Sequence, residues 1–484
     1  MLVSVVMFVI MASSRTRKAL SIESVLLADR SANSSQFGAS FAAASSSLAT
    51  VLIFFLNTSV QFGYLLFWCG ATYLFGQIVF IRFLKDKVKI QTSEMTTNAD
   101  FFLGKTGSIF SSRVIAFLTF FTFLAILFLE IYIGSEILRY YIGLSSNVAQ
   151  LIAFTLLGLV VISYVRLGGL RVVFKTDVWQ LLLMSLACIA LLIFAFLQPA
   201  SENQAAQRSY FEFAATGNDV IWFMAWILVV NLTLPFTQLS SWQRLAATKS
   251  TKEAYEGLIK TIPQFSIIWF IPVIAFIILN AKGLQFGSLS DVFDSVKAID
   301  PTIAVALFPL IFVGFASALF STADTALVAL QFSISDRATF GPVIAGKSER
   351  RIGTIYLVMT SAIVALLGAL YALAESYQSW FMPLIFIVFG QLTIIAPQLI
   401  YALRVHSGRW TRRSFTPAAT FWNVLGLLIA WIIAVGAGVI ETMWGADYAE
   451  YQEAATFLAL AISTAFLALA VRISPEATAS DGRA

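Results

Sequence analysis

The chain has 484 residues, of which 59% are hydrophobic and only 12% are charged, with a formal net charge of +5. Its mean hydropathy of +0.85 excludes a soluble globular domain of this length. The composition predicts an all-α polytopic membrane protein, because helices satisfy their own backbone hydrogen bonds in lipid. The two cysteines, Cys69 and Cys188, lie in apolar stretches and form no disulfide framework or metal motif. We expect the single histidine, His406, to be solvated in a basic loop.

Apolar stretches predict about thirteen membrane-crossing helices. The first, at 2–12, is too short to cross alone, since it would be about 16 Å long as a helix. It is either a short or truncated leading helix within residues 1–13 or a segment lying at the interface. A signal peptide is disfavoured because no basic region precedes the apolar run. The other stretches are 37–56, 60–83, 112–137, 147–165, 177–197, 219–239, 263–280, 303–332, 352–373, 380–403, 418–439 and 454–471.

The basic residues indicate the orientation of these helices. With the N-terminus outside and every stretch crossing, the inside loops hold 27 of the 31 Lys and Arg residues. This asymmetry follows the positive-inside rule and places the C-terminus in the cytoplasm. The basic excess is therefore a topology signal, and we expect no nucleic-acid partner. The four basic residues predicted outside are Arg139, Arg208, Lys282 and Lys297.

A hydrophilic cluster interrupts the apolar stretch at 304–333. An ionisable side chain at this depth is costly and usually faces a cavity or an ion path. Hydroxyl and carboxylate oxygens are hard ligands that suit a hard cation. The alternative is that the hydroxyls bond back to their own helix and the acid pairs with a neighbouring helix. The cluster contains Ser317, Ser321, Thr322, Asp324 and Thr325.

Four segments, in order along the chain, closely resemble motifs of the sodium:solute symporter family. One is an Asp-Arg-Ser entry followed by the first core helix, and another is a Gly-Gly turn followed by Thr-Asp and a Gln three residues later. The third resembles a cytoplasmic Gln-Arg…Ala-Lys-Ser…Glu-Ala segment, and the fourth resembles the sodium-site helix. Together with the helix count, the resemblance covers nearly the whole chain. These segments are 26–47, 166–180, 242–254 and 317–325.

The resemblance implies a LeuT-type fold with two inverted five-helix repeats at 37–197 and 219–403. Two accessory helices within 418–472 and a cytoplasmic tail at 473–484 would follow. In this fold the first helix of each repeat is broken near the midplane. In the second repeat, Pro235 frees a backbone carbonyl and favours such a break. In the first, the small polar run at 42–47 either opens or packs closely against a neighbour.

By the resemblance, one sodium ion would bind between the second and ninth stretches. The ninth would supply the Ala318 carbonyl and the Ser321 and Thr322 hydroxyls. The second would supply the carbonyls of Ala44 and Ser47. Such an oxygen cage replaces the hydration shell of sodium without an excess of fixed charge.

A second cation site or exit path is a further hypothesis. Asp177 occupies the family's Thr-Asp position, and Asp324 and Thr325 lie one turn below the first site. Two acids at such a site could instead share a proton, since like charges resist joint ionisation. Alternatively, Asp177 pairs with Lys175 or Arg171.

The solute is the least determined part of the prediction. Asn231 falls on a sugar-contacting asparagine of the family, but Leu234 and Ala374 replace polar residues that sugar carriers use. A bound sugar would find too few hydrogen-bond partners for its hydroxyl groups, so a small amino acid, carboxylate or similar solute fits better. Trp226 and Gln391 could instead pack or bridge helices, and Glu130 and Glu136 fit either an outer vestibule or a pair with Arg139. The candidate solute contacts are Asn231, Thr50, Trp226 and Gln391.

We therefore predict sodium-coupled symport of a small organic solute into the cell by alternating access, with no enzymatic activity and no cofactor besides Na⁺. The chain contains no nucleotide-binding loop, which disfavours transport driven by ATP. The partners would be the solute, sodium and the bilayer of the cell membrane; the oligomeric state is left open. The alternatives are a proton-coupled symporter that uses Asp177 and Asp324 and a transport-inactive solute sensor.

Overall fold

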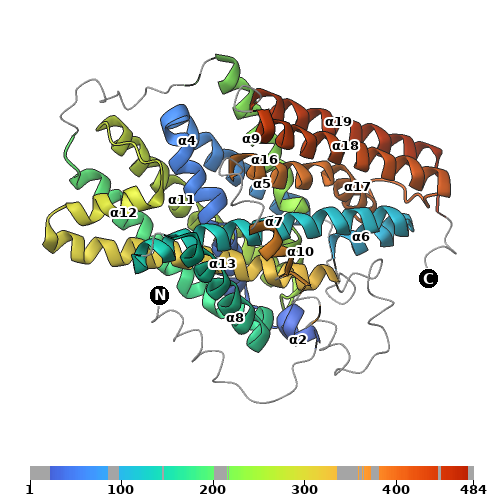
Figure 1. Ribbon diagram of the computed structural model, residues 1–484. Helices are drawn as coiled ribbons and strands as arrows, with labels where there is room; N and C mark the ends of the chain where they lie inside the picture. Colours follow the sequence, from blue (N-terminus) through green and yellow to red (C-terminus); the bar gives the residue numbers. More distant parts are fainter. Residues whose placement is uncertain are drawn as a thin grey trace. The chain divides into compact units, whose positions relative to one another are not determined.

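The structure is a computed structural model, and every named element in the residues that it describes is a helix (Figure 1). Nine helices in this part of the chain are long and apolar enough to cross a membrane, which supports an integral membrane protein. The predicted stretch at 2–12 and most of the one at 352–373 lie outside the described residues, so the count of thirteen stays a prediction. The described residues are 22–85, 97–143, 146–200, 215, 217–334, 358, 362, 363, 365–371, 381–444 and 449–477.

The chain forms two compact units, each assembled from separated parts of the sequence. The first unit contains Met1–Leu74, Ile126–Ile221 and Glu256–Val328, and the second contains Phe75–Ala125, Trp222–Tyr255 and Ala329–Ala484. The helices that begin in the first unit are α2 (Ile22–Leu27), η1 (Ala28–Arg30), α3 (Ser34–Ala44), η2 (Leu48–Ile53), α4 (Phe54–Phe62), η3 (Gly63–Leu66), α5 (Phe67–Lys85), α8 (Asn147–Leu197), α9 (Gly217–Thr237), α12 (Leu289–Ala298) and α13 (Pro301–Ile334).

The remaining helices begin in the second unit. Two of them, α7 and α11, continue into the first unit, just as α5, α9 and α13 continue into the second. They are α6 (Asn98–Thr106), α7 (Ile109–Ile142), α10 (Leu239–Ala246), α11 (Thr251–Ala281), α16 (Phe381–Ile394), α17 (Ala396–His406), α18 (Pro417–Trp444) and α19 (Ala449–Ile473).

The first core helix is broken where the sequence has three consecutive serines. Helix α3 ends at Ala44, and a helix resumes at Leu48 as the wide turn η2, which continues into α4. Serine hydroxyls compete with the backbone for helical hydrogen bonds, and the Ser46 hydroxyl donates to the Ala42 carbonyl at 2.7 Å. The small polar run at 42–47 therefore opens.

Helix α3 is held against α11 by contact between two backbones. A Cβ added at Gly38 would lie 2.8 Å from the Gly257 carbonyl oxygen, and one added at Gly257 would lie 2.8 Å from the Ser34 carbonyl oxygen. Small residues allow such close crossings of membrane helices. Lys260 of α11 adds hydrogen bonds from its ammonium to the Ser34 hydroxyl at 2.8 Å and the Ser35 hydroxyl at 3.1 Å.

Helix α8 covers two predicted stretches and kinks between them. The kink lies at Gly169, whose φ of 54° is open to glycine at little cost. A Cβ there would lie 2.6 Å from the Cα of Val25, so the turn packs directly on α2. Arg171 also forms an ion pair with Asp29 at 3.4 Å. Two of the motif segments, at 26–47 and 166–180, therefore meet in the first unit.

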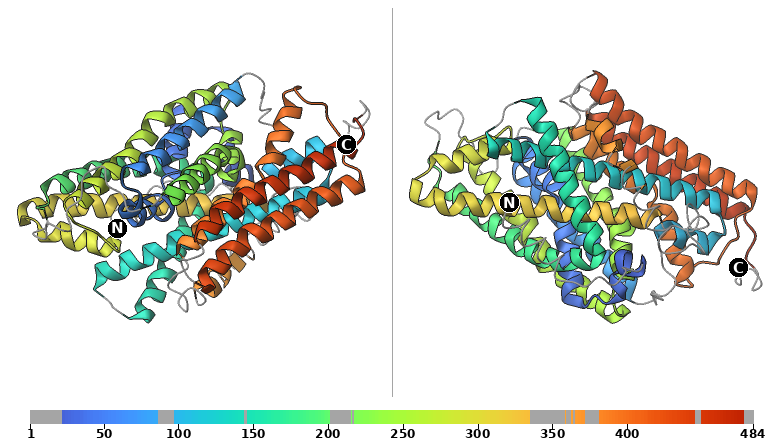
Figure 2. Two further views of the ribbon diagram at one scale, coloured as in Figure 1. Left: turned by 90° about the horizontal axis from the view of Figure 1, so that it is seen from above. Right: turned by 60° about the horizontal axis from the view of Figure 1, so that its bottom comes forward.

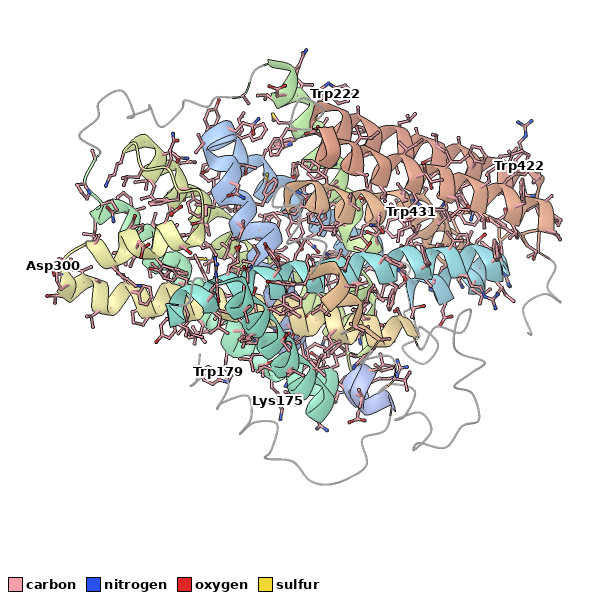
Figure 3. All side chains as sticks on the ribbon, viewed as in Figure 1. Lys175, Trp179, Trp222, Asp300, Trp422 and Trp431 are labelled. Carbon is pink, nitrogen blue, oxygen red and sulfur yellow. The ribbon has the colours of Figure 1, made fainter. Side chains whose placement is uncertain are left out.

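In the second unit, the helix that carries Pro235 is also interrupted. Helix α9 ends at Thr237, Gln238 has an extended backbone, and α10 begins at Leu239. The break thus follows the proline by three residues. Helices α18 and α19 lie side by side as a hairpin in both views of Figure 2, and Trp422 and Trp431 mark α18 in Figure 3.

Candidate functional site

Asp177 of α8 lies at the centre of a polar cluster in the first unit. Its side chain is fully buried. The carboxylate accepts a hydrogen bond from the Ser40 hydroxyl of α3 at 2.5 Å and another from the Ser321 hydroxyl of α13 at 2.6 Å. Lys175 and Trp179 lie on the exposed side of the same helix (Figure 3). The acid therefore joins three helices within the protein, while its neighbours two residues away face outward.

Among the described residues, two buried side chains near Asp177 and Ser321 in sequence contain polar atoms without hydrogen-bond partners. The Thr322 hydroxyl, next to Ser321 on α13, is buried and has no hydrogen-bond partner. Gln180 lies one helical turn after Asp177, and both polar atoms of its amide are also buried without a partner. Buried polar groups are nearly always hydrogen-bonded. A cluster that leaves several oxygens unsatisfied can coordinate a small cation.

Of the predicted first sodium site, the structure places Ser321 and Thr322 in this cluster. Ala44 is the last residue of α3, where helical carbonyls lack intrahelical partners, and Ser47 lies in the break that follows. Ala318 is fully buried on α13. All five residues of the predicted first sodium site therefore belong to the first unit. Ser317, by contrast, bonds to the Val313 carbonyl of its own helix at 2.8 Å.

The residues of the hypothetical second site are also buried in the first unit. Asp324 is fully buried, and Thr325 is almost so. The Thr325 hydroxyl lies 3.3 Å from a carboxylate oxygen of Asp324. Asp177 contacts the first-site residue Ser321, so its carboxylate orients a predicted sodium ligand. Arg171, one of the alternative partners of Asp177, pairs with Asp29.

Glu130 of α7 contacts the break in the first core helix. One carboxylate oxygen accepts hydrogen bonds from the Ser47 hydroxyl and from the Ala49 amide at 3.3 Å. Its side chain is fully buried, which does not fit an outer vestibule, one of the two alternatives for this residue. Glu136, which is six residues later, lies beside Arg139. The sequence signal for Glu130 is an acid within an apolar stretch.

The predicted solute contacts fall mainly in the second unit. Asn231 is buried on α9, where Gly76 of α5 packs against its backbone carbonyl. The Gln391 side-chain oxygen is buried without a hydrogen-bond partner. Trp226 donates to the Thr456 hydroxyl at 3.3 Å and packs on Phe386, which fits the packing alternative. The side chain of Thr50 lies outside the described residues, as does Ala374.

Three solved structures share this arrangement of helices. A Na⁺-coupled sialic acid symporter superposes with a TM-score of 0.71 at 14% identity, over 97% of this chain and 96% of that one. The manganese transporter of Eremococcus coleocola gives 0.53 at 14% identity, over 95% and 97%. Mhp1, a nucleobase-cation-symport-1 family transporter, gives 0.52 at 12% identity, over 96% and 99%.

These similarities confirm the predicted fold, an all-helical LeuT-type transporter architecture. The boundaries of the two repeats stay predictions. No protein-family model matches the chain, and no curated protein matches it in sequence. The sequence resemblance to the sodium:solute symporter family therefore stays a proposal.

Proposed function

We propose that this protein is a sodium-coupled symporter that carries a small organic solute into the cell by alternating access. The observation that carries the proposal is the buried Asp177 carboxylate, which accepts hydroxyl groups from α3 and α13 beside the unpartnered Thr322 hydroxyl. The fold shared with a Na⁺-coupled symporter supports it.

In the proposed cycle, sodium binds to the carbonyls of Ala44, Ser47 and Ala318 and to the hydroxyls of Ser321 and Thr322. The Ser321 hydroxyl donates a hydrogen bond to Asp177, which leaves the lone pairs of its oxygen available to the ion. The carboxylate adds negative charge close by without taking a place in the cage. A partner that orients a ligand in this way commonly tunes cation affinity.

The membrane potential supplies enough free energy for accumulation. One charge that crosses about 100 mV releases about 2.3 kcal/mol. At about 1.4 kcal/mol per tenfold change, the voltage alone supports about 40-fold accumulation of a neutral solute. Sodium coupling therefore needs no nucleotide.

The proposal is tested on purified protein with a panel of small solutes, each with and without sodium. A co-transported solute should stabilise the protein more when sodium is present, because the two ligands are linked. In vesicles, a Ser321→Ala, Thr322→Ala double variant should lose sodium-dependent uptake. Uptake with unchanged sodium dependence in this variant would refute the proposal.

A second sodium ion is bound, in this proposal, by Asp177, Ser321, Asp324 and Thr325. The burial of both acids supports it. An Asp324→Ala variant that keeps the wild-type ratio of sodium to solute in flux assays would exclude this second site.

The same two buried acids favour proton coupling as the second candidate function. Uptake that persists when choline replaces sodium at fixed pH would identify protons as the coupling ion. Measurable flux of either kind would exclude the transport-inactive sensor.

A further inference from the structure

A carboxylate from α7 fills the break in the first core helix. Oε1 of Glu130 accepts hydrogen bonds from the Ser47 hydroxyl and the Ala49 amide. Oε2 of the same carboxylate is buried and accepts none. All three residues belong to the first unit. The break therefore contains one satisfied and one unsatisfied acceptor.

The unsatisfied oxygen belongs to an acid without a countercharge. Among the described residues, no basic side chain pairs with Glu130. A buried carboxylate is strongly disfavoured unless a cation or several hydrogen bonds compensate for its lost hydration. The bonds from Ser47 and Ala49 at Oε1, together with the nearby Leu48 amide, supply only part of that compensation. A positively charged hydrogen-bond donor at Oε2 would supply the rest.

The same geometry disfavours a second anionic group at this end of the helix. Backbone amides at a helix N-terminus are the usual site for a carboxylate or phosphate. Here η2 and α4 form one continuous helix from Leu48 to Phe62, and its first turn already donates to Glu130. A carboxylate of the solute would compete for an occupied amide and meet a like charge. An ammonium group would meet an unpaired acceptor of opposite charge.

We propose that Oε2 of Glu130 binds a protonated amine of the transported solute, so that the substrate class is a small organic amine. This inference rests on the proposed transport function and narrows its solute. It favours compounds whose recognised group is an ammonium over those recognised through a carboxylate.

The test uses purified full-length protein and measures thermal unfolding with matched sets of small compounds. Members of a set share one carbon skeleton and end in a protonated amine, a neutral amide or a carboxylate. Each is titrated with and without sodium. We expect amines to stabilise the wild type, with affinities at least tenfold higher than those of the matched amides and carboxylates.

Glu130→Gln should weaken amine binding at least tenfold. Glu136→Gln is the matched control, because it removes an acid from the same helix with no hydrogen bond to the break. It should bind amines as the wild type does. Glu130→Asp, which retains the charge on a shorter side chain, should keep the preference for amines and serves if the glutamine variant does not fold.

Three results would overturn the inference: no amine stabilises the wild type, a matched amide or carboxylate stabilises it as well as the amine does, or Glu130→Gln retains amine affinity. The proposed function is tested separately by the wild type. It would fail if sodium did not stabilise the wild-type protein, either alone or together with any solute.

Discussion

Replacing Asp177 by asparagine should lower the affinity for sodium much more than it changes the free energy of unfolding. The carboxylate accepts two hydroxyl groups, at 2.5 Å from Ser40 and 2.6 Å from Ser321. Hydrogen bonds to a charged group contribute about 1.5–3 kcal/mol each. The asparagine side chain has one acceptor oxygen and one donor nitrogen, so one of the two hydroxyls loses its acceptor.

The electrostatic loss is larger than the hydrogen-bond loss. A unit charge at about 4 Å from sodium contributes about 4 kcal/mol at an effective dielectric constant of about 20. A loss of about 3–4 kcal/mol corresponds to a fall in sodium affinity of about 10²–10³-fold. Stability without sodium should change less than sodium affinity, because the loss of one hydrogen bond is offset by the removal of a buried charge.

The assay is a sodium titration of the unfolding temperature, with choline chloride keeping the ionic strength constant. Stabilisation grows with the ratio of free sodium to its dissociation constant, so the Asp177→Asn curve should move to much higher sodium. Asp29→Asn is the control, because it breaks only a half-exposed ion pair with Arg171 worth about 0–1 kcal/mol. An Asp177→Asn curve that coincides with the wild type would refute the role given to this acid.

Three further predictions concern single side chains. Thr322→Val should weaken sodium binding about tenfold in the same titration without lowering sodium-free stability, because the hydroxyl has no partner in the protein. Gly314→Val should lower the free energy of unfolding by about 1–3 kcal/mol, because a Cβ at this position would lie 2.8 Å from the Leu183 carbonyl oxygen. The control, Gly104→Ala, has open space around the new Cβ and should be neutral or stabilising in the same thermal melt. Lys282→Met should lower the free energy of unfolding by about 1–3 kcal/mol, because the ammonium donates to the carbonyls of Ala195, Phe196 and Gln198 at the end of α8. A thermal melt that matches the wild type would contradict this role.

The breaks in the core helices could be predicted because each has a local chemical cause. Pro235 cannot continue the hydrogen-bond ladder, and consecutive serines compete with it. Their exact positions depend on packing, so the second break falls at Gln238 rather than at the proline. Helix α12 does not follow from the apolar stretches, because its ten residues form an amphipathic helix too short to span a membrane. Ser288 and Asp291 nevertheless form its capping box.

The site was predictable where residues share one helix and hidden where helices meet. Ser321, Thr322 and Asp324 attract attention as polar residues in one apolar stretch. Ser40 contacts Asp177 across 137 positions of sequence, and Glu130 contacts Ser47 across 83. Neither pairing follows from periodicity, because it depends on how α3 crosses α7 and α8.

The crossing of Gly38 and Gly257 determines which helices can travel together. The two backbones approach closely here, and the Phe37 ring packs directly on Gly257, so the helices have little room to shift past each other. We therefore expect α3 and α11 to move together during a change of access. Spin labels placed on these two helices should report the same separation in every state of the cycle.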